Sequence, residues 1–344
     1  MRFSVGLPTC MEGMMYPVPF VSPDQMVELA THAEALGYHS VWGNDHLTTQ
    51  RYVRAEFAAP PNFWEILITL SFVAARTRTL RVATGVLIPA MRRDIVVTAK
   101  QLATLDQFSG GRLIVGMGVG AYREEFEALH PDWRVRRGDV LEESIQALRV
   151  LFKERVTRWQ GKYYHFENVE MYPKPVQDPL PIYVGGNNEN AVRRAALYAQ
   201  GWMGAAMPAE QIRPHIARLR EVAEKNGRDP NRIDIAPQFV ACIDQSHEAA
   251  LQRFRNSQMY KHLVSLSRTT LKDQVKAGAR FEETNLIGTR DDIIEKVEGL
   301  REAGVTHISG ILFTANSVEE FKDQMQRFAE QVMSHFQTRE ESIR

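Results

Sequence analysis

Cysteine is scarce in this chain. Of 344 residues only two are cysteines, Cys10 and Cys242, which lie far apart in the sequence. Such a pair favours neither a disulfide framework nor a thiolate metal site. We therefore expect two buried thiols in a reducing compartment and no metal site.

An excess of charge of one sign is also absent, and so is a long apolar run. Lysine plus arginine (42) equals aspartate plus glutamate (42), which argues against nucleic acid or an anionic membrane as the main partner. The longest apolar stretch, near residues 63–75, contains Glu65 and is too short to cross a bilayer. No apolar signal segment follows Arg2. We expect a cytoplasmic protein that binds neither nucleic acid nor membrane.

The stretch from Leu80 to Glu125 contains one strand–helix–strand unit. Residues 81–87 are rich in valine and leucine, and apolar residues then recur at helical spacing up to Phe108. Glycines 110 and 111 provide a left-handed helix end, and residues 113–115 form a second apolar strand. This pattern predicts a βαβ crossover between two parallel strands.

The same alternation continues along the chain. Strands are predicted at residues 3–7, 40–43, 81–87, 113–115, 182–184, 201–205, 233–243 and 306–313. Helices are predicted at residues 22–36, 63–76, 95–108, 139–152, 188–199, 211–225, 248–266, 289–304 and 319–336. This order predicts a single (β/α)8 barrel domain over residues 1–344. Two segments are predicted as insertions, a hairpin near 155–181 and a polar segment near 256–288.

Glycine is concentrated where several predicted strands end. Residues 116–121 read G-M-G-V-G-A, which satisfies a dinucleotide fingerprint, but Pro131 interrupts the helix that this motif requires. A tight turn and a place of close ligand approach both remain open for Gly118, Val119 and Gly120.

A second glycine-rich turn, Gly185-Gly186-Asn187-Asn188, stands between a strand and a helix start. It could bind a phosphate at the helix terminus, or it could be an ordinary turn in which Asn188 caps the helix. Thr84-Gly85 ends another strand.

Asp45 and His46 directly follow the predicted second strand. Barrel active sites lie at this end of the strands, and histidine moves protons near neutral pH. The alternative is that His46 is structural and Asp45 caps a turn. Trp42 would face the same interior or rim and could stack on a flat ligand.

Three segments carry a family resemblance. They are L-G-Y-H-S-V-W-G-N-D-H-L (36–47), L-A-T-L-D-Q-F-S-G-G-R-L-I-V-G-M-G-V-G (102–120) and P-K-P-V-Q-D-P-L-P-I-Y-V-G-G-N-N (173–188). Together with G-T-R-D-D-I-I-E-K-V-E-G-L-R-E-A-G-V-T-H-I (288–308), they resemble the bacterial-luciferase-like monooxygenase superfamily. The resemblance implies a barrel with insertions, often a homodimer, that binds FMN or the deazaflavin coenzyme F420.

The resemblance also implies roles for individual residues. Asp45 and His46 would contact the cofactor ring and His46 would transfer a proton, and the Asp-His pair resembles the F420-dependent branch. A non-prolyl cis peptide is expected at Gly85-Val86, behind the ring. The expected cofactor site comprises Trp42, Asp45, His46, Thr84, Gly85, Val86, Gly118, Val119, Gly120, Gly185, Gly186 and Asn187.

One departure bears on the substrate. The sugar-phosphate dehydrogenases of this branch place a glutamate where this chain has Ala121, which argues against sugar-phosphate oxidation. We therefore expect His46 and Asp45 to serve hydride transfer between F420 and another small organic substrate. The alternatives are an FMNH2-dependent monooxygenase served by a separate reductase and a flavin-binding protein without turnover. The loops 48–61, 122–137 and 256–284 match no substrate motif.

Overall fold

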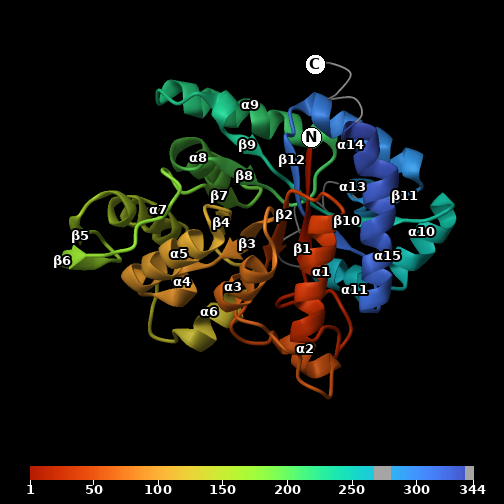
Figure 1. The fold of residues 1–344 in the computed structure, drawn as a ribbon, viewed down its shortest axis with the longest axis horizontal. Coiled ribbons are helices and arrows are strands. Elements are labelled where there is room, and N and C mark those ends of the chain that lie inside the picture. The colour runs from red at the N-terminus through yellow and green to blue at the C-terminus, as the bar shows by residue number, and fades with distance from the viewer. Residues whose placement is uncertain (267–279, 338–344) are drawn as a thin grey trace.

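The computed structural model describes residues 1–266 and 280–337. Its strands run through the centre of the molecule and its helices lie around them (Figure 1). In the described part of the chain, no helix is both long enough and apolar enough to span a membrane. The fold is of the α/β class, as the alternation of strand and helix patterns predicts.

A parallel sheet of ten strands forms the centre, in the order β11-β10-β12-β1-β2-β3-β4-β7-β8-β9. Its strands are β1 (Arg2–Leu7), β2 (Ser40–Gly43), β3 (Arg81–Leu87), β4 (Leu113–Met117), β7 (Ile182–Gly185), β8 (Gly201–Met203), β9 (Asp234–Ile235), β10 (Gln238–Ile243), β11 (Leu286–Gly288) and β12 (His307–Phe313). Since every pairing in this sheet is parallel, the carboxyl ends of neighbouring strands lie at one edge.

The two ends of this strand order belong to one stretch of chain. β9 and β10 are separated only by Ala236 and Pro237, and proline cannot donate to a strand partner. On one side Ala236 N–H donates to the carbonyl of Trp202 in β8, and on the other Ser309 N–H of β12 donates to the Pro237 carbonyl. The sheet is therefore curled, with this stretch hydrogen-bonded to both β8 and β12.

The helices lie between the strands along the chain, and several of them begin or end at capping residues. They are α1 (Pro23–Ala35), α2 (Arg51–Glu56), α3 (Ile66–Arg76), α4 (Pro89–Arg92), α5 (Ile95–Ser109), α6 (Arg123–Leu129), α7 (Arg137–Lys153), α8 (Glu189–Tyr198), α9 (Ala209–Lys225), α10 (His247–Arg255), α11 (Gln258–Leu266), α13 (Phe281–Thr284), α14 (Arg290–Ala303) and α15 (Val318–Phe328). Ser22 and Thr289 each form a capping box, and Gly110 ends α5 in the left-handed conformation.

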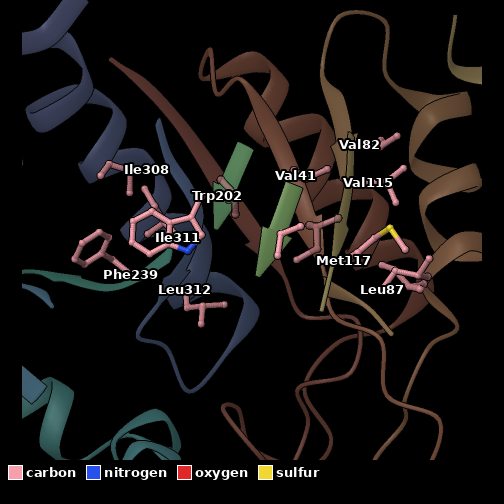
Figure 2. Close-up of a cluster of buried hydrophobic side chains, with 14 of the residues drawn as sticks. Val41, Val82, Leu87, Val115, Met117, Trp202, Phe239, Ile308, Ile311 and Leu312 are labelled. Carbon is pink, nitrogen blue, oxygen red and sulfur yellow. The ribbon is translucent and has the colours of Figure 1, made fainter. Parts of the chain in front are cut away.

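Two hydrophobic layers hold the sheet. The larger one packs the outward side chains of the strands against the helices, and Figure 2 shows part of it around Val41, Val115 and Phe239. The smaller one fills the inside of the curl. Its buried members are Trp42, Ala83, Ile114, Tyr183, Met203 and Ala236.

The sequence located most elements, with errors at their boundaries. The hairpin within 155–181 is confirmed as the antiparallel pair β5 (Val156–Gln160) and β6 (His165–Glu170), and both cysteines are buried and free. The helix predicted from residue 63 begins only at Ile66, because Glu65 is its N-cap and accepts the backbone N–H of Ile68.

Three further predictions need correction. The predicted strand 233–243 is broken at Pro237, and the predicted helix 248–266 is divided at Asn256 and Ser257. The segment near 256–288 that was predicted as an insertion contains a strand of the sheet, β11. Residues 267–279 of this segment lie outside the described part of the chain. The short helices α2, α4 and α6 were not predicted, because each offers too few turns for an apolar period to register.

Candidate functional site

The predicted site residues gather at the carboxyl edge of the curled sheet. Asp45 and His46 follow β2, Gly118 follows β4, and Gly186 follows β7. Gly85 and Gly116 lie slightly lower, inside β3 and β4. A separate cavity of about 550 Å³ lies among α9, α13, β11 and α14, and none of the predicted site residues lines it.

The peptide bond between Gly85 and Val86 is cis, as the resemblance implied. The pairing of β3 with β4 shifts register between Thr84 and Leu87. Two nearby glycines leave room for the Val86 side chain. A Cβ added at Gly118 would lie 2.6 Å from Val86 Cγ2, and one added at Gly185 would lie 2.8 Å from Val86 Cγ1. Glycine at these two positions is thus required by packing, whatever else approaches them.

Trp42 lies inside the curl, below this edge. Its ring is fully buried, and its Nε1–H donates to Ser40 Oγ at 2.8 Å. Added Cβ atoms at Gly85 and Gly116 would come within 3.2 and 3.1 Å of the ring. Trp42 therefore faces the interior, one of the two places that its position in the sequence allowed, and its stacking on a ligand stays a prediction.

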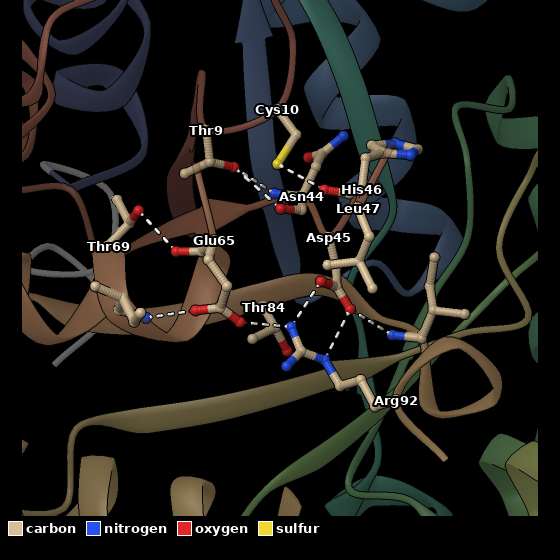
Figure 3. A network of polar contacts seen from close by, with 12 residues as sticks. Thr9, Cys10, Asn44, Asp45, His46, Leu47, Glu65, Thr69, Thr84 and Arg92 are labelled. Carbon is tan, nitrogen blue, oxygen red and sulfur yellow. Dashed lines mark hydrogen bonds and ion pairs between the residues drawn. The ribbon is translucent and has the colours of Figure 1, made fainter. Parts of the chain in front are cut away.

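The Asp45 carboxylate forms a buried ion pair with Arg92 (Figure 3). Arg92 Nη2 donates to Asp45 Oδ1 at 2.7 Å and to Glu65 Oε1 at 2.7 Å. The backbone N–H of Ile88 donates to Asp45 Oδ2 at 3.0 Å. Asp45 thereby joins β2 to the segment that follows β3. Its hydrogen-bond partners are Arg92 and Ile88, and none of these bonds goes to the neighbouring imidazole.

Glu125 on α6 orients His46 instead. Glu125 Oε2 lies 2.9 Å from His46 Nδ1, and Glu125 Oε1 accepts the backbone N–H groups of Leu47 at 2.7 Å and Thr48 at 3.3 Å. Because a carboxylate oxygen has only lone pairs to offer, Nδ1 carries the proton and donates it to Glu125 Oε2. Among the described residues, His46 Nε2 has no hydrogen-bond partner, which leaves a lone pair for proton transfer.

Gln50 completes the immediate surroundings of His46. Its amide nitrogen is placed 3.2 Å from His46 Nδ1, while its buried Oε1 has no partner among the described residues. Since Nδ1 already carries a proton, the reversed amide fits better, with the oxygen next to Nδ1 and the nitrogen facing the site. Asn44 Oδ1 is likewise buried and unpartnered. The site thus holds two amides with unused hydrogen-bonding capacity.

Aromatic rings surround the imidazole. The Phe63 and Tyr122 rings lie 5.9 and 6.0 Å from that of His46, centroid to centroid. Behind Tyr122 lie Tyr52 of α2 and His262 of α11. Burial raises the pKa of both tyrosines, that of Tyr52 to about 12, and burial lowers the pKa of His262 to about 3. All three side chains are therefore uncharged near pH 7.

The turn after β7 combines features of both readings left open by the sequence. Asn188 caps α8, since its side chain accepts the N–H of Ala191 at 2.9 Å. The Asn187 amide bonds to the backbone of Ala205, and Gly186 N–H donates to Met203. Within the described residues, the backbone N–H groups of Asn187 and Asn188 donate to no protein acceptor. The turn remains compatible with an anion beside its cap.

The loop after β4 is fixed by an arginine. Arg137 Nη1 donates to the carbonyls of Val119 at 2.9 Å and Gly120 at 3.0 Å. Gly120 has a positive φ of 77°, which a residue with a side chain rarely adopts. This loop therefore has a single defined path, with a guanidinium bound to it.

The sequence analysis missed Glu125, Arg92, Tyr52 and His262. None belongs to a motif, and each meets the site only through the fold. The one available signal was the acidic first turn of α6, at Glu124 and Glu125, directly after the glycine-rich loop.

Comparison with known proteins identifies relatives of this chain. The family model for luciferase-like monooxygenases matches residues 1–307. The chain is 28% identical over 301 residues to an F420-dependent glucose-6-phosphate dehydrogenase of Amycolatopsis mediterranei, covering 83% of this chain and 87% of the relative. It is 29% identical over 325 residues to an FMNH2-dependent dimethylsulfone monooxygenase of Pseudomonas putida, covering 86% and 84%. Among solved structures, monooxygenase RslO1 from Streptomyces bottropensis is similar with a TM-score of 0.79 and 25% identity, over 98% of this chain and 100% of that one.

Proposed function

This chain belongs to the luciferase-like monooxygenase family, and we propose that it is an oxidoreductase that transfers a hydride between coenzyme F420 and a small organic substrate. The observation that carries the proposal is His46, held by the buried Glu125 carboxylate at the carboxyl edge of the sheet. The similarity to F420-dependent dehydrogenases over most of the chain supports the choice of cofactor.

For the architecture we propose a closed (β/α)8 barrel. Its strands would be β1, β2, β3, β4, β7, β8, the combined β9 and β10, and β12, with β11 as an additional strand beside β10. Support comes from the hydrogen bonds that join the β9–β10 stretch to both β8 and β12. In this arrangement residues 1–344 form one domain with the 155–181 hairpin as an insertion.

The residues at the carboxyl edge fit a planar, polar cofactor. Val86, with Gly118 and Gly185 beside it, would form the floor under the ring. The buried Asn44 Oδ1 and the half of the Gln50 amide that faces the site offer hydrogen bonds to polar ring atoms. Gly120, Gly186 and Asn187 would line the path of the phosphate-bearing chain, next to the free N–H groups of the turn. When bound, F420 supplies a two-electron hydride acceptor or donor.

The protein's own part in the reaction is proton transfer and positioning. His46 Nε2 takes the proton of a substrate hydroxyl as the hydride leaves the carbon, or returns it in the reverse direction. The Glu125 carboxylate stabilises the resulting imidazolium and keeps the tautomer correct. Asp45 acts as a positioning residue, because with Arg92 it fixes the backbone at Ile88.

Sugar phosphates are not the proposed substrates. Ala121 stands where the resemblance places a glutamate in sugar-phosphate dehydrogenases, and it provides no acid or base. Wild-type protein should therefore not oxidise glucose 6-phosphate with F420. An Ala121→Glu variant that remains inactive with it would show that more than this one side chain differs.

We propose a homodimer that pairs through α3 and α5. These adjacent helices expose an apolar surface that includes Ile68, Phe72, Val97 and Phe108, of which Phe72 is 66% and Phe108 82% exposed. An apolar patch of this kind is typical of a protein interface. If the chain instead reduces its substrate, or uses FMNH2, a separate reductase would supply the reduced cofactor.

The proposal is tested by comparing cofactor binding and turnover in one variant. His46→Asn should bind F420 like wild type in a fluorescence titration but reduce it about a hundredfold more slowly. Unchanged turnover per bound cofactor would refute the role of His46.

A second candidate is an FMNH2-dependent monooxygenase, favoured by the similarity to the dimethylsulfone enzyme. It predicts tighter binding of FMN than of F420, together with oxygen uptake. A third candidate, cofactor binding without turnover, predicts tight binding and no reaction with any substrate.

A further inference from the structure

A chain of three uncharged polar side chains begins beside His46 and ends in the interior. Tyr122, at the start of α6, is half-buried and lies next to the imidazole. Its hydroxyl lies 3.4 Å from that of Tyr52, which lies 3.0 Å from His262 Nδ1. His262 is only 3% exposed. The proton transfer assigned to His46 uses none of these three groups.

The hydrogen bonds of the three groups share one direction when the proton of the neutral His262 is on Nε2. In that tautomer Nδ1 is the acceptor, and Tyr52 O–H donates to it. The Tyr52 oxygen then accepts the proton of Tyr122. Burial keeps both phenols protonated by raising their pKa, and keeps His262 neutral by lowering its pKa. The Tyr122 hydroxyl therefore turns its proton inward and presents lone pairs to the site.

His46 presents an acceptor in the same way. Its Nδ1–H is bound to Glu125, so only the Nε2 lone pair remains. Tyr122 Oη and His46 Nε2 belong to rings whose centroids lie 6.0 Å apart, and in this arrangement both atoms accept hydrogen bonds. A ligand that satisfies both must offer two donors.

We infer that the substrate is an alcohol with a second O–H or N–H group next to the reacting hydroxyl, and that Tyr122 is the residue that selects it. This inference rests on the proposed function. The reacting hydroxyl donates to His46 Nε2, and the second group donates to Tyr122 Oη. Tyr52 and His262 are positioning residues, since they hold the Tyr122 proton away from the substrate.

The test compares trans-cyclohexane-1,2-diol with cyclohexanol, which lacks the second donor. Ligand-observed NMR titration of the cofactor-free protein measures both dissociation constants. The diol should bind about 3- to 10-fold more tightly, as one additional neutral hydrogen bond provides. Tyr122→Phe should abolish this preference while leaving cyclohexanol binding unchanged. Tyr172→Phe, at an exposed tyrosine distant in sequence, is the control and should keep the preference.

Tyr52→Phe provides a second variant should Tyr122→Phe fail to fold. It releases the Tyr122 proton toward the site, so it should also reduce the preference for the diol. Equal binding of both alcohols by wild type, or an equal loss for both in Tyr122→Phe, would overturn the inference.

Turnover separates this inference from the proposed function. In steady-state assays with F420, Tyr122→Phe should raise KM for the diol and leave kcat within about twofold. A wild-type protein that prefers the diol in binding but oxidises neither alcohol would support the inference about recognition and refute alcohol oxidation.

Discussion

Replacing Glu125 by glutamine tests how the site controls His46. In the Glu125→Gln variant the side-chain oxygen can still accept the N–H groups of Leu47 and Thr48, so the fold should survive. The new amide nitrogen would face His46 Nδ1 and can only donate. The imidazole must then carry its proton on Nε2, which removes the lone pair needed for proton transfer.

The size of the effect follows from the burial and distance of the pair. Glu125 and His46 are 2% and 11% exposed in their side chains, and Oε2 lies 2.9 Å from Nδ1. A charge-assisted hydrogen bond of this kind contributes about 1.5–3 kcal/mol. Without this hydrogen bond the imidazolium that forms during proton transfer is less stable, so the proton-transfer step should be about 10- to 150-fold slower. The change of tautomer adds to this loss.

Two measurements check this prediction. Long-range ¹H–¹⁵N NMR of histidine-labelled protein should show the proton on Nδ1 in wild type and on Nε2 in Glu125→Gln, without any cofactor or substrate. Single-turnover F420 reduction should be slower in the same variant. Glu124→Gln is the matched control, because Glu124 bonds to the backbone of Arg51 and not to His46. An unchanged tautomer and rate in Glu125→Gln, or an equal loss in the control, would refute the reasoning.

The remaining predictions concern stability and assembly. Arg92→Gln leaves the buried Asp45 carboxylate without its cation and should lower the free energy of unfolding by about 3–5 kcal/mol in urea titrations. Arg123→Gln, in an exposed pair, should change it by less than about 1 kcal/mol. Burial lowers the pKa of His39 to about 4. As the pH falls, His39 is protonated in the unfolded chain before it is protonated in the folded one. Its contribution to the free energy of unfolding should therefore be complete above about pH 6.5 and be lost toward pH 4. His39→Gln should reduce this loss in thermal denaturation. Phe72→Glu should convert the proposed dimer to monomers in light scattering, and a dimer that persists would exclude this face.

Local signals predicted the parts of the fold and site that are local in sequence. The helix ends at Ser22, Gly110 and Thr289 were predicted because capping depends on adjacent residues. His46 was found because it directly follows a strand, and the cis peptide at Gly85-Val86 was found through the family resemblance.

Partners that meet only through the fold were not predictable in this way. Glu125 and His46 are 79 residues apart, and Arg92 and Asp45 are 47 apart. Adjacency in sequence did not reveal the partner of Asp45, because successive residues at a strand end point in different directions. For Trp42 the sequence left both the interior and the rim open, because the residue pattern does not show how deep inside the curl a side chain lies.

Parallel titration of the protein with F420 and FMN, followed by an anaerobic single-turnover reaction with an alcohol, tests the central claim most directly. We predict tighter binding of F420, its reduction by the alcohol without oxygen, and loss of that reduction but not of the binding in His46→Asn. Preferential binding of FMN, with product formed only when oxygen is admitted, would contradict the account.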